Sequence, residues 1–188
     1  MDVLTSVFIG IGLAMDASAV SIAGGANAKK KKTGILRSAL MAGLFFGAFQ
    51  AGMIFLGGIG GESAKALVSG IDHWIAFALL AFVGGKMVIE AFREPEERKV
   101  DLLHIRMLFI LAIATSIDAL AVGVGLAFID HSLIASAIIV GITTALISIA
   151  SVFIGHSFGH RIGNKVEIVG GMILIAIGAN ILQSHLFA

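Results

Sequence analysis

Six long apolar runs, separated by short polar segments, make up most of this 188-residue chain. They cover residues 3–28, 38–61, 73–92, 107–129, 133–158 and 166–186. An α-helix needs about 20 apolar residues to cross the hydrocarbon core of a bilayer. Because lipid offers the backbone no hydrogen-bond partner, proline-free runs of this length are expected to be helical. We therefore predict an all-α integral membrane protein with six transmembrane helices and a single transmembrane domain, residues 1–188.

The composition excludes several classes of protein. Hydrophobic residues make up 58% of the chain and charged residues 13%, against about 45–50% and 25% in soluble domains. A soluble enzyme, a nucleic-acid-binding module and a disordered chain are therefore excluded, and the short loops leave no room for an extramembrane catalytic domain. The chain also has no cysteine, and hence no thiolate metal site or cysteine nucleophile. We expect no enzyme activity and no cofactor, with the lipid bilayer as the main partner.

The basic residues predict the orientation in the membrane. Eleven of the 13 lysines and arginines lie in the segments that follow the first, third and fifth runs. Loops rich in lysine and arginine face the cytoplasm. These three segments, including the linker 93–106, should therefore be cytoplasmic, and both termini should lie outside.

An internal repeat divides the chain into two halves. Residues 14–22 resemble residues 116–124, with aspartate, two alanines and a valine recurring 102 positions apart. A weaker echo, 98 positions apart, joins glycines of the second and fifth runs. Because three helices precede the second half, that half enters the membrane from the opposite side. We predict two inverted three-helix repeats, residues 1–92 and 107–188, an architecture that places transport sites near the bilayer midplane.

Two aspartates lie deep within the apolar runs. Asp16 and Asp118 recur at matching positions of the two halves, near the middle of the first and fourth runs. An intramembrane carboxylate costs at least ~2.5 kcal/mol, and two facing carboxylates repel unless a divalent cation or a shared proton lies between them. We predict a metal site at this pair; the alternative is structural capping or pairing with a buried base. We expect no lysine or arginine at this depth, with Lys86 pairing with Glu90 or extending to the surface.

Further polar residues are secondary candidates for a cation path. Gln50 and Ser148 occupy matching positions of the second and fifth runs, and Asn180 lies in the sixth. Their oxygens suit a hard-cation shell, but hydrogen bonding between helices is an equal alternative. Glu167, at the predicted inner end of the sixth helix, is interpreted as a cap or as a group that receives an entering cation.

Two further groups of residues have metal-binding potential. Met15 adjoins Asp16, but a methionine in a membrane helix usually serves packing. His156 and His160 have the i, i+4 spacing of some metal sites and lie at the predicted inner end of the fifth helix.

The two aspartate segments, residues 14–22 and 112–128, resemble the bacterial manganese efflux pump family of the MntP type, within the lysine exporter superfamily. Residues 73–77, 84–90 and 167–171 match that family as well, so the resemblance covers nearly the whole chain. It implies a multi-pass protein of the bacterial plasma (inner) membrane that exports Mn(II), and it implies that Asp16 and Asp118 are the acidic residues of the site. Ser18 departs from the family, where an aromatic residue is expected; it would widen the site or add an oxygen ligand.

The leading hypothesis is a manganese exporter that works by alternating access at the two aspartates. One alternative is an exporter of another divalent metal or of a cationic amino acid, although the carboxylate of an amino acid would need a buried base that we do not expect. Another is a membrane interaction subunit without transport activity, which would have no need of two midplane carboxylates. The chain length is compatible with a homodimer. The energy source is open between proton antiport, membrane potential and the metal gradient.

Overall fold

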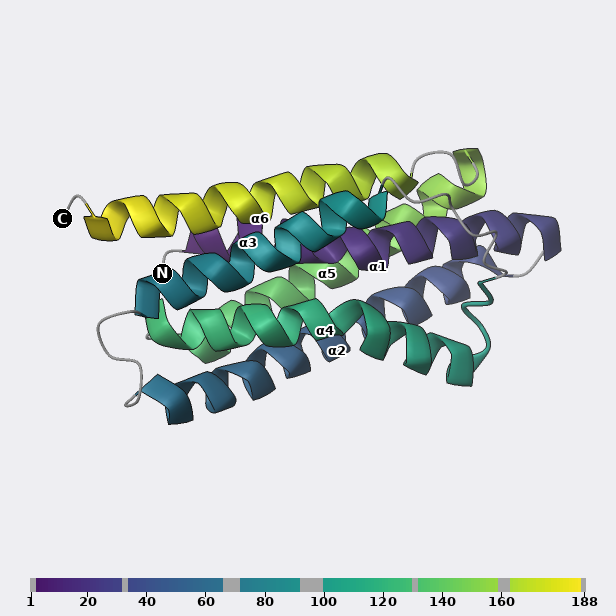
Figure 1. Ribbon diagram of the computed structural model, residues 1–188. Helices are drawn as coiled ribbons and strands as arrows, with labels where there is room; N and C mark the ends of the chain where they lie inside the picture. The colour runs from purple at the N-terminus through teal and green to yellow at the C-terminus, as the bar shows by residue number, and fades with distance from the viewer. Residues whose placement is uncertain are drawn as a thin grey trace.

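The computed structural model describes residues 3–31, 34–65, 72–91, 100–129, 132–158 and 163–186. Six α-helices account for nearly all of them (Figure 1). In chain order these are α1 (Val3–Lys31), α2 (Ile35–Lys65), α3 (Asp72–Ala91), α4 (Ile105–Ile129), α5 (Leu133–Phe158) and α6 (Gly163–Leu186).

Each predicted apolar run forms one helix, and most helices extend a few residues beyond the apolar run at one or both ends. Within the described residues, α1, α2, α4 and α5 each contain an apolar stretch long enough to cross a membrane. The described apolar stretches of the other two are shorter, Trp74–Lys86 in α3 and Met172–Gln183 in α6. The all-helical class is therefore confirmed, with four helices long and apolar enough to cross a membrane, while a crossing by α3 and by α6 remains a prediction.

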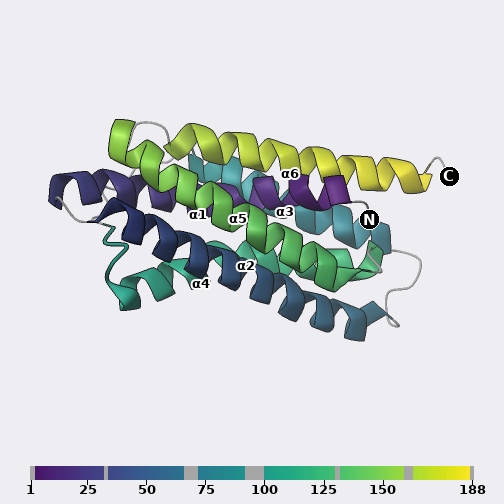
Figure 2. The ribbon, with the colours of Figure 1, turned by 180° about the vertical axis from the view of Figure 1, so that it is seen from behind.

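Successive helices run in opposite directions along the bundle (Figure 1). As a result, α1 begins and α6 ends at the same end of the molecule, also when it is viewed from behind (Figure 2). The helix pairs in most extensive contact are α1 with α5, α2 with α4, α2 with α5, and α3 with α6. Together with the contacts of α1 with α6 and of α3 with α4, they arrange the helices in a closed ring in the order α1, α5, α2, α4, α3 and α6.

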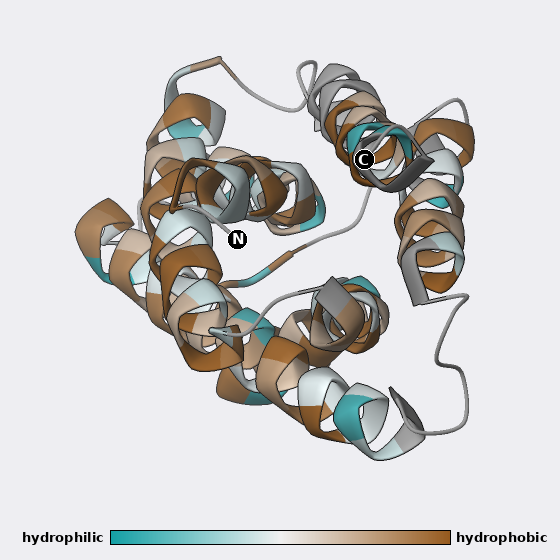
Figure 3. Cartoon of the chain, turned by 90° about the vertical axis from the view of Figure 1, so that its left-hand side faces the viewer, coloured by the Kyte–Doolittle hydropathy of each residue, from teal (hydrophilic) through white to brown (hydrophobic). Residues whose placement is uncertain are grey.

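Large apolar side chains cover the outside of the bundle. Leu44, Phe82 and Leu146 are each more than 60% exposed, and hydrophobic residues dominate the outward faces of the helices in an end-on view (Figure 3). Single exposed leucines are normal in soluble proteins, but a whole surface of them indicates lipid as the solvent.

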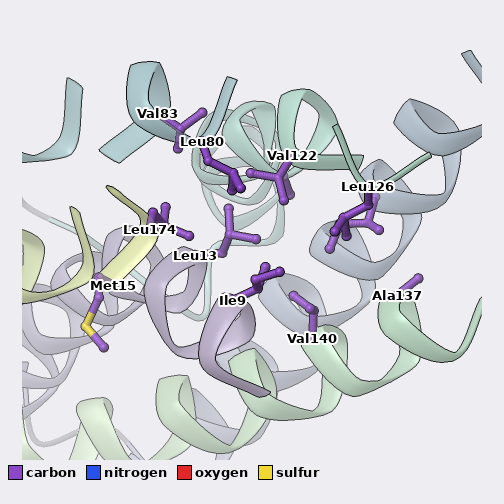
Figure 4. Close-up of a cluster of buried hydrophobic side chains, with 12 residues drawn as sticks. Ile9, Leu13, Met15, Leu80, Val83, Val122, Leu126, Ala137, Val140 and Leu174 are labelled. Carbon is purple, nitrogen blue, oxygen red and sulfur yellow. The ribbon is translucent and has the colours of Figure 1, made fainter. Parts of the chain in front are cut away.

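Two apolar clusters fill the interior on either side of its middle. Cluster A lies toward the end where α1 begins and contains Ile9, Leu13, Ile54, Leu80, Val122 and neighbouring side chains (Figure 4). Cluster B lies toward the opposite end and contains Phe46, Leu108, Val152 and, from the segment that precedes α4, Val100 and Leu102. The interior of the bundle is therefore closed by packed side chains toward both ends.

Glycines allow the closest helix crossings. A Cβ atom on Gly25 would overlap the carbonyl oxygen of Val152, and a Cβ on Gly123 would overlap that of Ile54. The first contact joins α1 to α5 and the second joins α4 to α2. Such close backbone approach is typical of small residues at membrane helix interfaces.

A second pair of contacts repeats the same arrangement. A Cβ on Gly155 would overlap the carbonyl oxygen of Ile22, and one on Gly57 would overlap that of Leu120. In both pairs of contacts, every residue of one crossing has its counterpart 98 positions away in the other. The packing of α1 and α4 thus follows a shift of 98 residues, whereas the aspartate echo in the sequence has a shift of 102.

Candidate functional site

A buried glutamine connects four helices in the middle of the bundle. Gln50, on α2, is 0% exposed. Its Nε2 donates to the carbonyl oxygen of Leu13 on α1 at 2.8 Å and lies 3.5 Å from that of Thr115 on α4. Its Oε1 accepts a hydrogen bond of 2.7 Å from Thr144 Oγ1 on α5. One amide therefore holds both aspartate-bearing helices at the same level of the bundle.

Asp16 and Asp118 flank this glutamine from opposite directions. Each lies three residues after the carbonyl group that Gln50 contacts, which is a rise of about 4.5 Å along an α-helix. Because α1 and α4 are antiparallel (Figure 1), the two rises lead away from Gln50 toward opposite ends of the bundle. Side chains of a helix lean toward its N-terminus, so both aspartate side chains lean back toward the level of Gln50.

Asp118 is paired with a lysine. Lys86 Nζ, on α3, lies 2.8 Å from Asp118 Oδ1 and 3.0 Å from Oδ2. The Asp118 side chain is 8% exposed and that of Lys86 is 36% exposed. The prediction that no base reaches the depth of the aspartates is therefore wrong. The side chain of Glu90, the partner expected for Lys86, lies outside the described side chains.

The error has a physical cause. Lys86 is near one end of α3, where its side chain was expected to pair with Glu90 or to extend to the membrane surface. The flexible four-carbon stem of a lysine extends inward as easily when a carboxylate lies there, and the ammonium group then lies much deeper than its Cα. Only the packing of α3 against α4 shows which direction the side chain takes.

A metal ion at this level would need neutral oxygen ligands in addition to the carboxylates. Within the part of the chain that the structure describes, no group of three histidine, cysteine, aspartate or glutamate side chains lies close enough together to hold a metal. Asp16 is partly buried. Carboxylate, carbonyl and water oxygens are the ligands that suit Mn, Mg and Ca, so amide, hydroxyl and backbone oxygens around Gln50 would have to complete the shell.

The other predicted residues occupy different environments. Ser148, on α5, is 0% exposed, and its Oγ has no hydrogen-bond partner among the described residues. Asn180, on α6, is exposed, and the Glu167 side chain, in the second turn of α6, lies outside the described side chains. Of the three, only Ser148 is therefore shown to be buried in the interior.

Sequence reasoning missed two more buried hydroxyl groups. Ser21 on α1 and Ser116 on α4 are 0% exposed, and neither Oγ has a hydrogen-bond partner among the described residues. Their signal in the sequence is only that a serine interrupts an apolar run. This signal does not distinguish a serine in the interior from one that faces lipid.

Two of the remaining candidates, Met15 and Ser18, contact other side chains of the bundle. Met15 is buried with the side chains of cluster A, as the packing interpretation predicts. Ser18 Oγ lies 2.6 Å from Ser151 Oγ, so this departure from the family pattern connects α1 to α5. His156 is partly buried on α5, and its proposed partner His160 lies outside the described residues.

Ionisable residues at membrane depth mark ion and substrate pathways. A helical membrane protein with a lysine and an aspartate paired at this depth is therefore typical of transporters. Residues 34–182 match a family model described as "Mntp: Putative manganese efflux pump", and the chain belongs to this family. The family is one of efflux transporters rather than enzymes.

Curated relatives agree over nearly the whole chain. A protein of Methanosarcina mazei named "Putative manganese efflux pump MntP" is 46% identical over 186 residues, covering 99% of this chain and 98% of the relative. A protein of the same name from Gloeothece citriformis is 46% identical and covers 99% of this chain and 97% of its own. One from Clostridium perfringens is 43% identical, covering 98% and 96%. No solved structure matches the chain.

Proposed function

We propose that this protein exports Mn²⁺ from the cytoplasm across the plasma membrane, and that the ion binds between Asp16 and Asp118. The observation that carries the proposal is the single amide of Gln50 contacting backbone carbonyl groups on both α1 and α4. Because each of these carbonyl groups lies within one turn of an aspartate, the two carboxylates belong to the same layer of the bundle. The choice of manganese as the transported metal comes from the family to which the chain belongs.

Neutral oxygens around Gln50 suit the rest of the ion's shell. The Gln50 Oε1 atom accepts one hydrogen bond from Thr144 and retains a second lone pair. The Ser148 hydroxyl is buried and has no partner among the described atoms. With two carboxylates these groups form an oxygen-rich set that matches the preference of Mn²⁺. Glu167 is proposed to receive the ion on the cytoplasmic side, and exposed Asn180 is the weakest of the predicted ligands.

Alternating access fits this position. Clusters A and B close the interior toward the two ends, so opening one cluster while the other stays packed would expose the layer to one side only. The constant shift of 98 residues between the glycine contacts supports two inverted repeats as the moving units. With a shift of 98 residues, the position that matches Asp118 is Val20 and not Asp16. Asp16 therefore lies four residues, about one helical turn, before the position that matches Asp118.

A cationic amino acid is the second candidate substrate, and the structure gives it a specific basis. The sequence argument against it was the lack of a buried base, yet Lys86 lies beside Asp118. An ammonium group already binds this carboxylate, and Lys86 could in turn pair with a substrate carboxylate. Free lysine therefore belongs in any competition experiment.

The test is Mn²⁺ flux in proteoliposomes with a controlled pH gradient. Asp16→Asn and Asp118→Asn should each reduce the flux to background, because either change halves the negative charge of the site where the dielectric constant is low. The double variant should be no worse than either single one, since residues that act as a unit are non-additive. Glu62→Gln, which alters an exposed carboxylate at the end of α2, is the matched control and should transport normally.

The outcomes separate the hypotheses. Near-normal Mn²⁺ flux in Asp118→Asn would contradict the two-carboxylate site. Competition by free lysine, with no competition by divalent metals, would favour the amino-acid exporter. A pH gradient that changes the flux would identify proton antiport as the energy source. The homodimer stays a prediction.

A further inference from the structure

We propose that Lys86 is a built-in competitor of the transported ion: its ammonium group occupies Asp118 when the site is empty and must leave before a metal can bind there. Lys86 would thereby determine the affinity of the site and its preference for divalent ions. The inference rests on the proposed function in one respect, namely that Asp118 is a metal ligand.

The geometry makes the two cations mutually exclusive. Lys86 Nζ lies 2.8 Å and 3.0 Å from the two carboxylate oxygens of Asp118, directly in front of the group. A metal ion bound by the same carboxylate would lie ~2–2.6 Å from its oxygens and would occupy the same space. Two cations this close would also repel each other strongly in a medium of low dielectric constant.

The difference in burial indicates which partner moves. The Asp118 side chain is 8% exposed and the Lys86 side chain 36%. The carboxylate is on a short side chain of α4, whose backbone is held through the contact between Thr115 and Gln50. The ammonium group is at the end of a flexible stem, and that side chain is partly exposed. We therefore infer that Asp118 stays in place while Lys86 swings away.

The pair also explains how an empty site is tolerated. An uncompensated buried charge is strongly destabilising, and a transporter must pass through a state without cargo. Lys86 neutralises Asp118 in that state without leaving the protein. A monovalent ion offers the carboxylate no more charge than Lys86 does, whereas a divalent ion is attracted twice as strongly at equal distance. Displacement of Lys86 therefore favours divalent cargo.

The test measures Mn²⁺ binding to the purified full-length protein in detergent, by loss of the electron paramagnetic resonance signal of free aqueous Mn²⁺. Lys86→Met keeps the length of the stem and removes the competing charge, so the apparent Kd should fall at least tenfold. Lys86→Arg should raise the apparent Kd several-fold, because a guanidinium binds a carboxylate through two parallel hydrogen bonds. Arg106→Met, at an exposed position of α4, should leave it unchanged.

A merely structural role for Lys86 predicts different results. An unchanged or increased Kd in Lys86→Met would overturn the inference. If Lys86→Met does not fold, the Kd of Lys86→Arg tests the inference instead. Unchanged or tighter Mn²⁺ binding in Lys86→Arg would then overturn the inference. Measured by flux in proteoliposomes, the KM for Mn²⁺ should fall with the Kd in Lys86→Met.

The same titration separates this inference from the proposed function. If Asp118→Asn binds Mn²⁺ as tightly as the unaltered protein, the proposed metal site is wrong. If Asp118→Asn loses binding while all Lys86 variants bind like the unaltered protein, the metal site holds and only the competition by Lys86 is wrong.

Discussion

Gln50 and Ser148 show how differently two matching residues can behave. They lie 98 positions apart on α2 and α5 and are both fully buried. Gln50 has partners on three other helices, whereas the Ser148 hydroxyl has no partner among the described residues. A buried polar group contributes to stability when it is hydrogen-bonded and costs free energy when it is not. The first residue should therefore matter for folding, and the second is available for a ligand.

Substitution of the two residues should have opposite consequences for stability. Gln50→Ala removes the links from α2 to α1, α4 and α5 and leaves Thr144 without its acceptor, so the free energy of unfolding should fall by about 1–3 kcal/mol. Ser148→Ala removes a hydroxyl without a partner and should leave stability unchanged or slightly higher. Thermal unfolding in detergent, followed by the fluorescence of the single tryptophan, measures both. Equal losses would mean that Gln50 does not connect the helices as described.

At the scale of the helices, glycines determine which faces meet. Gly57 and Gly155 let the backbones of α2 and α5 approach those of α4 and α1 so closely that no Cβ atom fits. Gly52 and Gly60, on the same helix α2, have open space where a Cβ would lie. Glycine is therefore required at Gly57 and Gly155 and dispensable at Gly52 and Gly60.

This difference predicts the effect of adding one methyl group. Gly155→Ala and Gly57→Ala should each destabilise the protein by about 1–3 kcal/mol, since overpacking forces backbone shifts. Gly52→Ala and Gly60→Ala should be neutral or stabilising, because alanine is the better helix former. Melting temperatures and yields of monodisperse protein check all four variants. Tolerance of alanine at Gly155 would contradict the described crossing of α1 and α5.

At the scale of the whole molecule, the bundle has two distinct ends. The alternating helices place the start of α1 and the end of α6 at one end (Figure 1). The last residues of α1, α3 and α5, which the basic segments follow in the sequence, lie at the other end (Figure 1). By the positive-inside rule, the end with the termini should face outward.

Cysteine labelling tests this orientation, and the absence of native cysteine gives a clean background. A cysteine at Ser132, which is exposed before α5, should react from outside intact cells with a membrane-impermeant maleimide. A cysteine at His104, which is exposed before α4, should react only after the membrane is opened. The reverse pattern would invert the topology and the proposed direction of export.

Much of the architecture follows from the sequence alone. A bilayer allows a chain this apolar to satisfy its backbone only as helices, so six runs predict six helices, with ends correct to within a few residues. Asp16 and Asp118 are recognisable for the same reason, since a carboxylate among apolar residues is too costly to be incidental. The sequence also predicts Gln50 as a polar residue at depth.

The shift of 98 residues between the helix contacts and the partner of Asp118 were decided only by the tertiary structure. A helix returns to nearly the same face after four residues, so the sequence echo at 102 positions and the packing at 98 positions present similar faces, and periodicity cannot choose between them. Lys86 is equally ambiguous, because its long stem reaches either the membrane surface or the interior. Its pairing with Asp118 depends on how α3 packs beside α4, which no local sequence pattern encodes.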